Sequence, residues 1–251
     1  MDESTSDIRQ RLRYQVTAAT LILNDQGILT YSGHLSARLP DRDRFLIQSV
    51  NDSRGELQPA DLLICGLDGQ VLDGPRGDHP PSEVFIHTEI LKARPEVNAV
   101  AHFHHDPTTT FSLVEDVPLQ AVLNHAVRWE SGIPIHPDPS HVSSAALGHA
   151  LTATLGPHNG LIIHAHGEVV VAESVTGLLI DCVHFVENAE ALYRAAVLGR
   201  VKPLSAADMA QFRREYDRVH HVRKLWRYYV GRSRSKGLLP ADWWPFLDAE
   251  A

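Results

Sequence analysis

The chain has 251 residues, of which 43% are hydrophobic and 22% are charged. This balance is ordinary for a folded globular protein and excludes a chain that is mainly disordered. The 31 acidic and 23 basic residues give a formal charge of -8, which argues against nucleic acid or an anionic membrane as the main partner, because both favour a positive surface.

The cysteines and the apolar runs indicate the cellular compartment of the protein. Only two cysteines occur, Cys65 and Cys182, and they form no paired motif, so we expect neither a disulfide framework nor a zinc ribbon. The charged opening MDESTSDIRQ is unlike a secretory signal, and no apolar run approaches the roughly 20 residues of a membrane helix. We therefore expect a cytoplasmic protein with no membrane or nucleic-acid partner.

The first third of the chain combines one helix with short strands. Residues 5–24 place apolar side chains at helical spacing before the turn NDQG. The segments HLSARLP and RFLIQSV predict a hairpin joined by DRDR, and DLLICGLDGQVLDG predicts a strand, an Asp-Gly turn and a further strand. The composition of GPRGDHPP predicts a loop at residues 74–81.

The rest of the chain alternates strands with longer helices. A helix is predicted at residues 82–93, with Ser82 as its N-cap, and VNAVAHFHH then predicts a strand. After an irregular middle we expect a helix around residues 143–155, the strand GLIIHAH, its hairpin partner EVVVAES, and a long helix that ends at Gly199. One last helix is predicted from about residue 206 to 229, where its basic and aromatic residues indicate a surface or subunit contact.

Three histidines stand within four positions of the segment VNAVAHFHHD, residues 97–106. Because side chains alternate along a strand, His102 and His104 project to one side and Phe103 to the other. Two imidazoles at this spacing can reach one cation at about 2.0–2.1 Å. The pair is therefore a candidate for metal ligation, and partly buried, hydrogen-bonded histidines are the structural alternative.

A second apolar strand ends in HAHG, where His164 and His166 are predicted to share a face. Gly167 lets the chain turn away closely after His166, which makes His166 the better candidate for a third ligand. The alternative is that both histidines only line the end of a sheet.

Two further residues are candidates. Glu83 is predicted in the first turn of the helix, where it either complements the helix dipole or faces the metal. His125, in LNHA, either lines the cavity or packs in the core.

Three motifs in this order resemble the class II aldolase and adducin superfamily: GHLSARL at 33–39, SEVFIHTEILKARPEVNAVAHFHHD at 82–106, and LIIHAHGEVVVAES at 161–174. The resemblance implies a three-layer α/β/α fold with a central, mainly antiparallel sheet. It implies one such domain over residues 1–251, with residues 206–251 as a C-terminal helical extension. It also implies a homo-oligomer, usually a tetramer, with active sites between subunits.

The resemblance also implies the roles of the site residues. By position, His102, His104 and His166 hold one divalent metal ion per subunit, zinc, manganese or iron(II), and Glu83 is the acid/base. Adducin-like structural members tend to lack these ligands, so their presence favours an enzyme. C-terminal tyrosines reach a neighbouring site in some relatives, which makes Tyr228 a further candidate.

The chain departs from the sugar-phosphate aldolases of this family. Those enzymes usually have Gly-Asn where this chain has Gly33-His34, and two serines where it has Pro81-Ser82. These positions cradle the substrate phosphate, and Pro81 offers neither an N–H nor a hydroxyl. We therefore expect a substrate without a phosphate.

Gly-His followed by Ser-x-Arg instead resembles the branch with metal-dependent decarboxylases of hydroxylated aromatic or pyridine carboxylates and related non-haem iron oxygenases. In that branch, His34 and Arg38 would meet a carboxylate or phenolic oxygen, with Gly33 and Ser82 also at the substrate. The alternative is a turn histidine and a surface arginine. His34 is the second candidate, after Glu83, for moving a proton.

The leading prediction is a metal-dependent carbon–carbon lyase, a decarboxylase or aldolase, that acts on a small non-phosphorylated hydroxy carboxylic acid, aromatic in character. Three alternatives remain open: a non-haem iron(II) oxygenase acting on an aromatic 2-oxo or hydroxy acid, a sugar-phosphate class II aldolase, and a non-catalytic adducin-like interaction protein.

Overall fold

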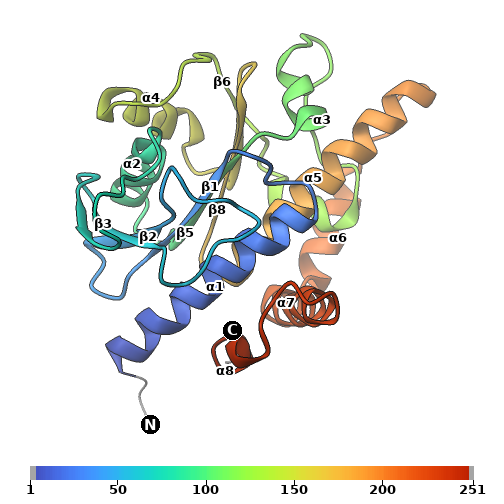
Figure 1. The fold of residues 1–251 in the computed structure, drawn as a ribbon. Coiled ribbons are helices and arrows are strands. Elements are labelled where there is room, and N and C mark those ends of the chain that lie inside the picture. The colour runs from blue at the N-terminus through green and yellow to red at the C-terminus, as the bar shows by residue number, and fades with distance from the viewer. Residues whose placement is uncertain (1–3, 249–251) are drawn as a thin grey trace.

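The computed structural model describes residues 4–248, which form one eight-stranded sheet with helices on both faces (Figure 1). The strand order is β4-β3-β2-β1-β5-β8-β7-β6. Every neighbouring pair is antiparallel except β6 and β7. The predicted three-layer α/β/α fold with a mainly antiparallel sheet is confirmed.

The strands are short and follow the predicted hairpins. Their bounds are β1 His34–Arg38, β2 Arg44–Ile47, β3 Leu63–Gly66, β4 Val71–Asp73, β5 Ala99–Phe103, β6 Ile135–His136, β7 Gly160–Ile163 and β8 Gly167–Ala172.

The α-helices are α1 Thr5–Asp25, α2 Val84–Ala93, α3 Asp106–Thr109, α4 Ala145–Leu155, α5 Val175–Leu198, α6 Ala206–Glu215, α7 Arg218–Ser235 and α8 Trp244–Leu247. Three 3-10 helices complete the described elements: η1 Thr110–Ser112, η2 Asn124–Trp129 and η3 Ala241–Trp243. Within the described part of the chain, no helix has both the length and the apolar character needed to cross a membrane.

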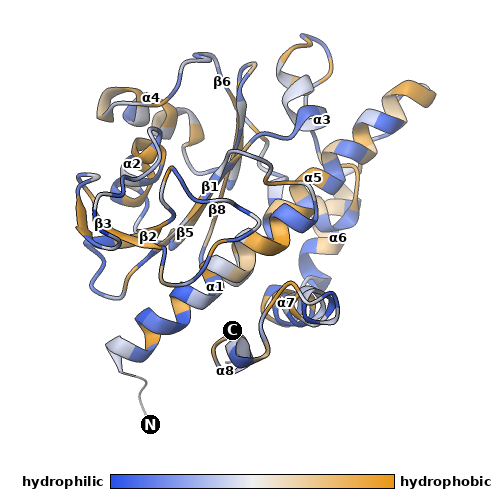
Figure 2. Ribbon diagram, viewed as in Figure 1, coloured by the Kyte–Doolittle hydropathy of each residue, from blue (hydrophilic) through white to orange (hydrophobic). Residues whose placement is uncertain are grey.

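The alternation of side chains along the strands divides the core into two. On β5, Ala99, Ala101 and Phe103 pack in the larger apolar cluster with α1 and α5. Val100 points to the opposite face and packs in the smaller cluster with α2 and α4. Figure 2 shows the hydrophobic residues concentrated in the central strands and in α1 and α5. This period of two decides which polar side chains of the strands face α2.

Three predicted elements differ in the structure. The single helix expected over residues 206–229 is two helices, because Tyr216 and Asp217 are extended and the Asp217 carboxylate accepts the His220 N–H to cap α7. The predicted strand GLIIHAH ends at Ile163, and residues 164–166 form the tight turn between β7 and β8. The short elements α3, η1, η2 and β6 lie in the middle that was expected to be irregular.

The C-terminal residues return to the body of the molecule. Helix α7 packs against α5, and α8 packs against α1. Phe246 stacks on Tyr14 with ring centroids 4.1 Å apart, and the Trp226 indole N–H donates to the Leu247 carbonyl at 2.8 Å. The aromatic segment DWWPF therefore anchors the tail through burial.

Candidate metal-binding active site

The polar face of the central strands meets helix α2. His34 on β1 lies directly opposite His102 on β5 in the antiparallel register, and both point away from the larger apolar cluster. Helix α2 covers this face and contacts β5. It carries Glu83 immediately before its first residue and His87 one turn later. The topology thus brings three separate segments together around the end of β5.

Four side chains converge at this point. Glu83, His102, His104 and His166 each offer a ligand atom, and these atoms all lie within 4.8 Å of one another. The ring centroids are 4.7 Å apart for His102 and His104, and 5.2 Å apart for each of these with His166. The structure therefore brings together the three histidines and the glutamate that the sequence pointed to.

The hydrogen bonds of these imidazoles leave nitrogen atoms free for a cation. His102 donates from Nδ1 to the Glu168 carbonyl at 2.9 Å, while its Nε2 is buried and has no hydrogen-bond partner among the described residues. His104 Nδ1 is bonded to the Ser32 hydroxyl at 2.7 Å. His166 Nδ1 is also buried without a hydrogen-bond partner. A buried orphan nitrogen is costly, and two imidazoles fixed by their second nitrogen are typical of metal ligands.

Burial favours the neutral form of His104, which is the form of imidazole that binds metal. Burial first, and then the neighbouring His102 and His166, lower the pKa of His104 to about 4. Glu83 is 5% exposed, and its Oε1 accepts the Val142 N–H at 2.9 Å. Burial raises the pKa of Glu83, but its contacts with His102 and His166 lower it by more, so the group is a carboxylate. Three imidazoles and one carboxylate fit a divalent transition metal.

Two glycines allow the segments to approach closely enough. A Cβ on Gly167 would lie 2.5 Å from both the Phe103 carbonyl and the His104 ring. Gly33 has a φ of +92°, and a Cβ there would lie 2.9 Å from the His102 carbonyl. Both positions need glycine for contact with the histidine strand. Gly33 thus has a structural role at the site.

His34 belongs to a buried chain of hydrogen bonds behind the cluster. Its Nδ1 is 2.7 Å from His87 Nε2, and His87 Nδ1 is 2.6 Å from the Ser36 hydroxyl. Its ring lies 5.2 Å from the His102 ring. Burial and then His87 hold the pKa of His34 well below its usual value, so the ring is neutral. The chain ties His34 to the site at Nδ1 and leaves Nε2 for another partner.

Arg38 and Ser82 do not lie where the prediction placed them. Arg38 is at the opposite end of β1 from His34, and its guanidinium donates to four backbone carbonyls, those of Leu91, Val97, Arg94 and Arg42. Its donors are occupied, so the predicted role in substrate binding is wrong. Ser82 is exposed and does not cap α2, because the helix begins at Val84 and Glu83 occupies the cap position.

The three further candidates also lie outside the cluster. His164, in the turn after β7, donates from Nδ1 to the Ser112 carbonyl at 2.8 Å, which fixes the turn rather than a metal. His125 is on η2 and stacks on His184 of α5, on the other side of the sheet. Tyr228 is 55% exposed on α7. Its predicted role in a neighbouring subunit stays a prediction.

Sequence reasoning missed His87, Ser36 and His141. His87 is four residues after Glu83, so the helical period places both on one face of the helix. Ser36 is two residues after His34, so the strand period places both on one side of the strand. His141 is exposed, with its ring 5.3 Å from that of His166. Only the fold brings it there, because the 136–144 segment has no regular pattern.

The sequence matches a known protein family and several known proteins. Residues 14–193 match the family model described as class II aldolase and adducin N-terminal domain. Methylthioribulose-1-phosphate dehydratase of Methylococcus capsulatus is 31% identical over 176 residues, which cover 64% of this chain and 80% of that protein. 3,4-Dihydroxyphthalate decarboxylase of Rhodococcus jostii is 25% identical over 221 residues, which cover 83% of this chain and 88% of that protein.

A solved structure supports the fold. L-fuculose 1-phosphate aldolase of Glaciozyma antarctica superimposes with a TM-score of 0.81 at 19% identity and covers 94% of each chain. At this identity the likeness concerns the fold alone. The two sequence relatives are a dehydratase and a decarboxylase, which confirms the prediction of an enzyme with lyase chemistry.

Proposed function

Because this chain belongs to the class II aldolase and adducin family, we propose that it is a divalent-metal-dependent lyase that breaks a carbon–carbon bond in a small hydroxy carboxylic acid without a phosphate. Of the two reactions of this type, we propose decarboxylation before aldol cleavage. The observation that supports the proposal most directly is the convergence of His102, His104 and His166 on the Glu83 carboxylate, with the buried, unpartnered Nε2 of His102 3.3 Å from it.

The three histidines would hold the metal ion, which is zinc, manganese or iron(II). When bound, the ion would act as a Lewis acid that stabilises negative charge developing on a substrate oxygen next to the breaking bond. Two features of the protein prepare the ligands. Glu168 and Ser32 fix the orientation of the His102 and His104 rings, and Gly167 lets β8 pass close to His104.

Glu83 is the proposed acid/base. It lies at the N-terminus of α2, where the unpaired N–H groups favour a carboxylate. Its Oε2 is 3.3 Å from His102 Nε2 and its Oε1 is 3.5 Å from His166 Nε2. A carboxylate held this close to the ligand atoms is within reach of a proton on a chelated substrate. Its role is to take or return that proton at the reacting carbon or oxygen.

His34 is proposed to position the substrate from the other side of His102. The hydrogen bonds that link Ser36, His87 and His34 can run in either of two donor-to-acceptor directions. If the Ser36 hydroxyl donates to His87, then His34 Nδ1 accepts and its Nε2 carries a proton for the substrate. If Ser36 accepts, then His34 Nε2 is an acceptor. In either form, the uncharged His34 ring presents Nε2 in a fixed orientation to a substrate oxygen or hydroxyl.

The absence of a phosphate from the substrate is proposed from the residues that line this end of the sheet. Pro81 is buried next to Glu83 and has no N–H, and Arg54 donates from Nε to the Gly33 carbonyl and from Nη1 to the Asp52 carbonyl. The aromatic acid named for the Rhodococcus jostii relative fits this chemistry. A sugar-phosphate lyase is the second candidate, because the names of the other two compared proteins contain phosphate esters.

Metal analysis tests the site. We expect His104→Ala to contain about one ion per chain fewer than the wild type at the same free metal, because the three-histidine site is lost. His149→Ala, which removes an exposed histidine of α4, is the matched control and should keep the wild-type content. Equal metal in the wild type and His104→Ala would refute the ligand assignment.

A substrate screen tests the reaction. Hydroxyaromatic carboxylic acids are incubated with the metal-loaded enzyme with and without oxygen, and carbon dioxide release is measured. We expect release without oxygen, and its loss in Glu83→Gln. Turnover that requires oxygen would favour the iron(II) oxygenase, turnover of sugar phosphates alone would favour the second candidate, and a protein that retains no metal would favour an interaction role.

A further inference from the structure

A second group of histidines lies on the other side of the sheet, where η2, α5 and α7 meet. His125 comes from η2, and His184 and Glu187 stand one turn apart on α5. The His125 and His184 rings stack with centroids 4.2 Å apart, and the His221 ring of α7 lies 5.2 Å from that of His184. The catalytic proposal uses none of these residues.

We propose that His125, His184 and Glu187 form a second site for a divalent transition metal ion such as zinc, with His221 as a fourth ligand. The ligand atoms of the first three residues all lie within 4.8 Å of one another, the same limit that the proposed catalytic ligands satisfy. His125 Nε2 is 3.5 Å from Glu187 Oε2. Tetrahedral zinc with bonds of about 2.0–2.1 Å places its ligand atoms roughly 3.4 Å apart, so a modest closure completes the site.

Unpartnered nitrogens point to a ligand at this position. Among the described residues, the Nε2 atoms of His125 and His221 are both buried and neither has a hydrogen-bond partner. His184 is only 7% exposed. Burial, and then His125 and His221, lower the pKa of His184 to about 3, so its ring is neutral and available to a metal at pH 7. A bound cation would satisfy nitrogens that are otherwise buried at a cost.

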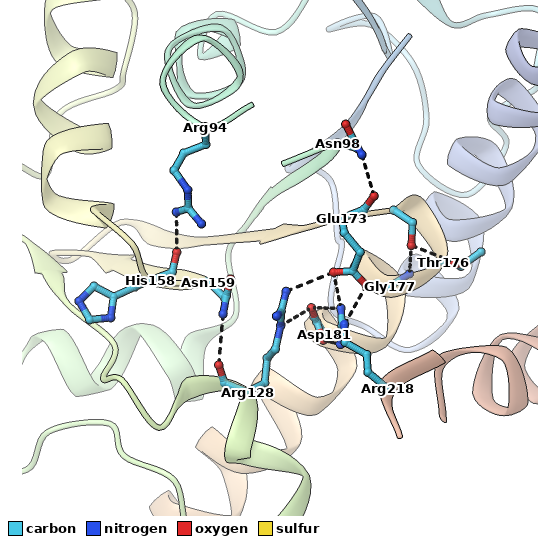
Figure 3. Close-up of polar contacts among 11 residues, drawn as sticks. Arg94, Asn98, Arg128, His158, Asn159, Glu173, Thr176, Gly177, Asp181 and Arg218 are labelled. Carbon is cyan, nitrogen blue, oxygen red and sulfur yellow. Dashed lines mark hydrogen bonds and ion pairs between the residues drawn. The ribbon is translucent and has the colours of Figure 1, made fainter. Parts of the chain in front are cut away.

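A rigid ionic network places these side chains. Arg128 of η2, Asp181 of α5 and Arg218 of α7 are joined by charged hydrogen bonds of 2.8 to 3.1 Å, and Glu173 accepts further bonds from both arginines (Figure 3). Each histidine of the second group is three residues from the network member on its own element, on the same face of that helix. The network therefore fixes the three elements one turn away from the proposed metal.

The surroundings allow a metal to enter and suggest what it does. His125 and His221 line a cleft of about 260 Å³ that also contains Glu215 and Tyr216. The Glu187 side chain is 49% exposed, so the site opens toward solvent. Because His221 comes from the segment after residue 206, a metal here would join the C-terminal helices to α5. The site is proposed as structural rather than catalytic.

Four proteins separate the two sites: the wild type, His104→Ala, Glu187→Gln and the double variant. Each is stripped of metal and then dialysed against limiting zinc to count the bound ions. The same proteins loaded with cobalt in place of zinc report the coordination through their absorption spectra. We expect about two, one, one and no tightly bound ions per chain, in that order. The failures are distinguishable: if only the catalytic proposal is wrong, His104→Ala matches the wild type while Glu187→Gln still holds one ion fewer than the wild type.

Two further variants complete the test. His220→Ala removes an exposed histidine next to His221 and should keep the wild-type stoichiometry. His184→Ala should lose the same ion as Glu187→Gln, with at least a tenfold weaker zinc affinity. Zinc should raise the melting temperature of His104→Ala, and this shift should vanish in the double variant. Equal zinc affinity in His104→Ala and in the double variant would overturn the proposal.

Discussion

Single residues at the candidate active site are held by contacts that tolerate little change. Gly167 shows this most directly, because a Cβ there would meet a backbone carbonyl as well as the His104 ring. We expect Gly167→Ala to cost about 1–3 kcal/mol of stability through overpacking and to weaken metal binding at least tenfold. Thermal unfolding and metal titration would measure both effects.

Gly231 provides the control for that substitution. It lies within α7, and a Cβ there would have no heavy atom within 4 Å. Gly231→Ala should therefore be neutral or stabilise the protein by about 0.5–1 kcal/mol. A Gly167→Ala protein as stable and as metal-rich as Gly231→Ala would show that the close approach is not required.

His87 is expected to act as a positioning residue through its bond to His34. His87→Leu removes both hydrogen bonds of its ring. We expect kcat on the acid found in the screen to fall about tenfold or more while metal content stays at the wild-type level. His87→Gln, whose amide keeps one bond to His34, should recover part of the loss. A larger effect on metal content than on kcat would assign His87 to the folding of the site instead.

At the scale of elements, the ionic network decides how α7 docks on the domain. Asp181 is fully buried and Arg218 donates to both of its oxygens, at 2.9 and 2.8 Å. Arg218→Ala would leave that charge with Arg128 alone, so we expect a loss of about 3–5 kcal/mol in the free energy of unfolding. Denaturant titration measures it.

The matched control is an exposed pair on neighbouring elements. Arg213 of α6 pairs with Glu130, and the arginine side chain is 60% exposed. Arg213→Ala should cost much less than Arg218→Ala, because solvent screens the pair. Equal losses in Arg213→Ala and Arg218→Ala would mean that the buried network does not hold α7.

At the scale of the whole molecule, the end of α5 indicates an assembly surface. Figure 1 shows the last turns of α5 projecting beyond the sheet layers, and Tyr193, Val197 and Leu198 there are 46%, 74% and 89% exposed. Apolar side chains grouped on a protruding helix are typical of subunit contacts. This supports the predicted homotetramer.

We expect the wild type to be a homotetramer by light scattering and Leu198→Glu to shift it toward smaller species, because the contact would bury a charge. Leu72→Glu, at an exposed position of the edge strand β4, is the control and should leave the assembly unchanged. A wild-type mass of 27.8 kDa in solution would refute the tetramer.

The amino-acid sequence by itself determined the local patterns. Alternation along residues 97–105 predicted that His102 and His104 share a face, and the periods of the strands and of α5 predicted where those elements lie along the chain. The three-layer fold class was implied by the resemblance to a family. These features depend on neighbours in the chain, so they can be read without the tertiary structure. Glu83 and His166 were also identified, but through resemblance to a family rather than through spacing alone.

Only the tertiary structure decided which distant segments meet. Strand register brought His34 opposite His102, and the packing of α2 added His87 behind it. The same packing occupied Arg38 with backbone carbonyls and removed it from the site. The group around His184 joins segments more than 30 residues apart. Such contacts arise from the burial of whole elements against one another, and no local pattern encodes them.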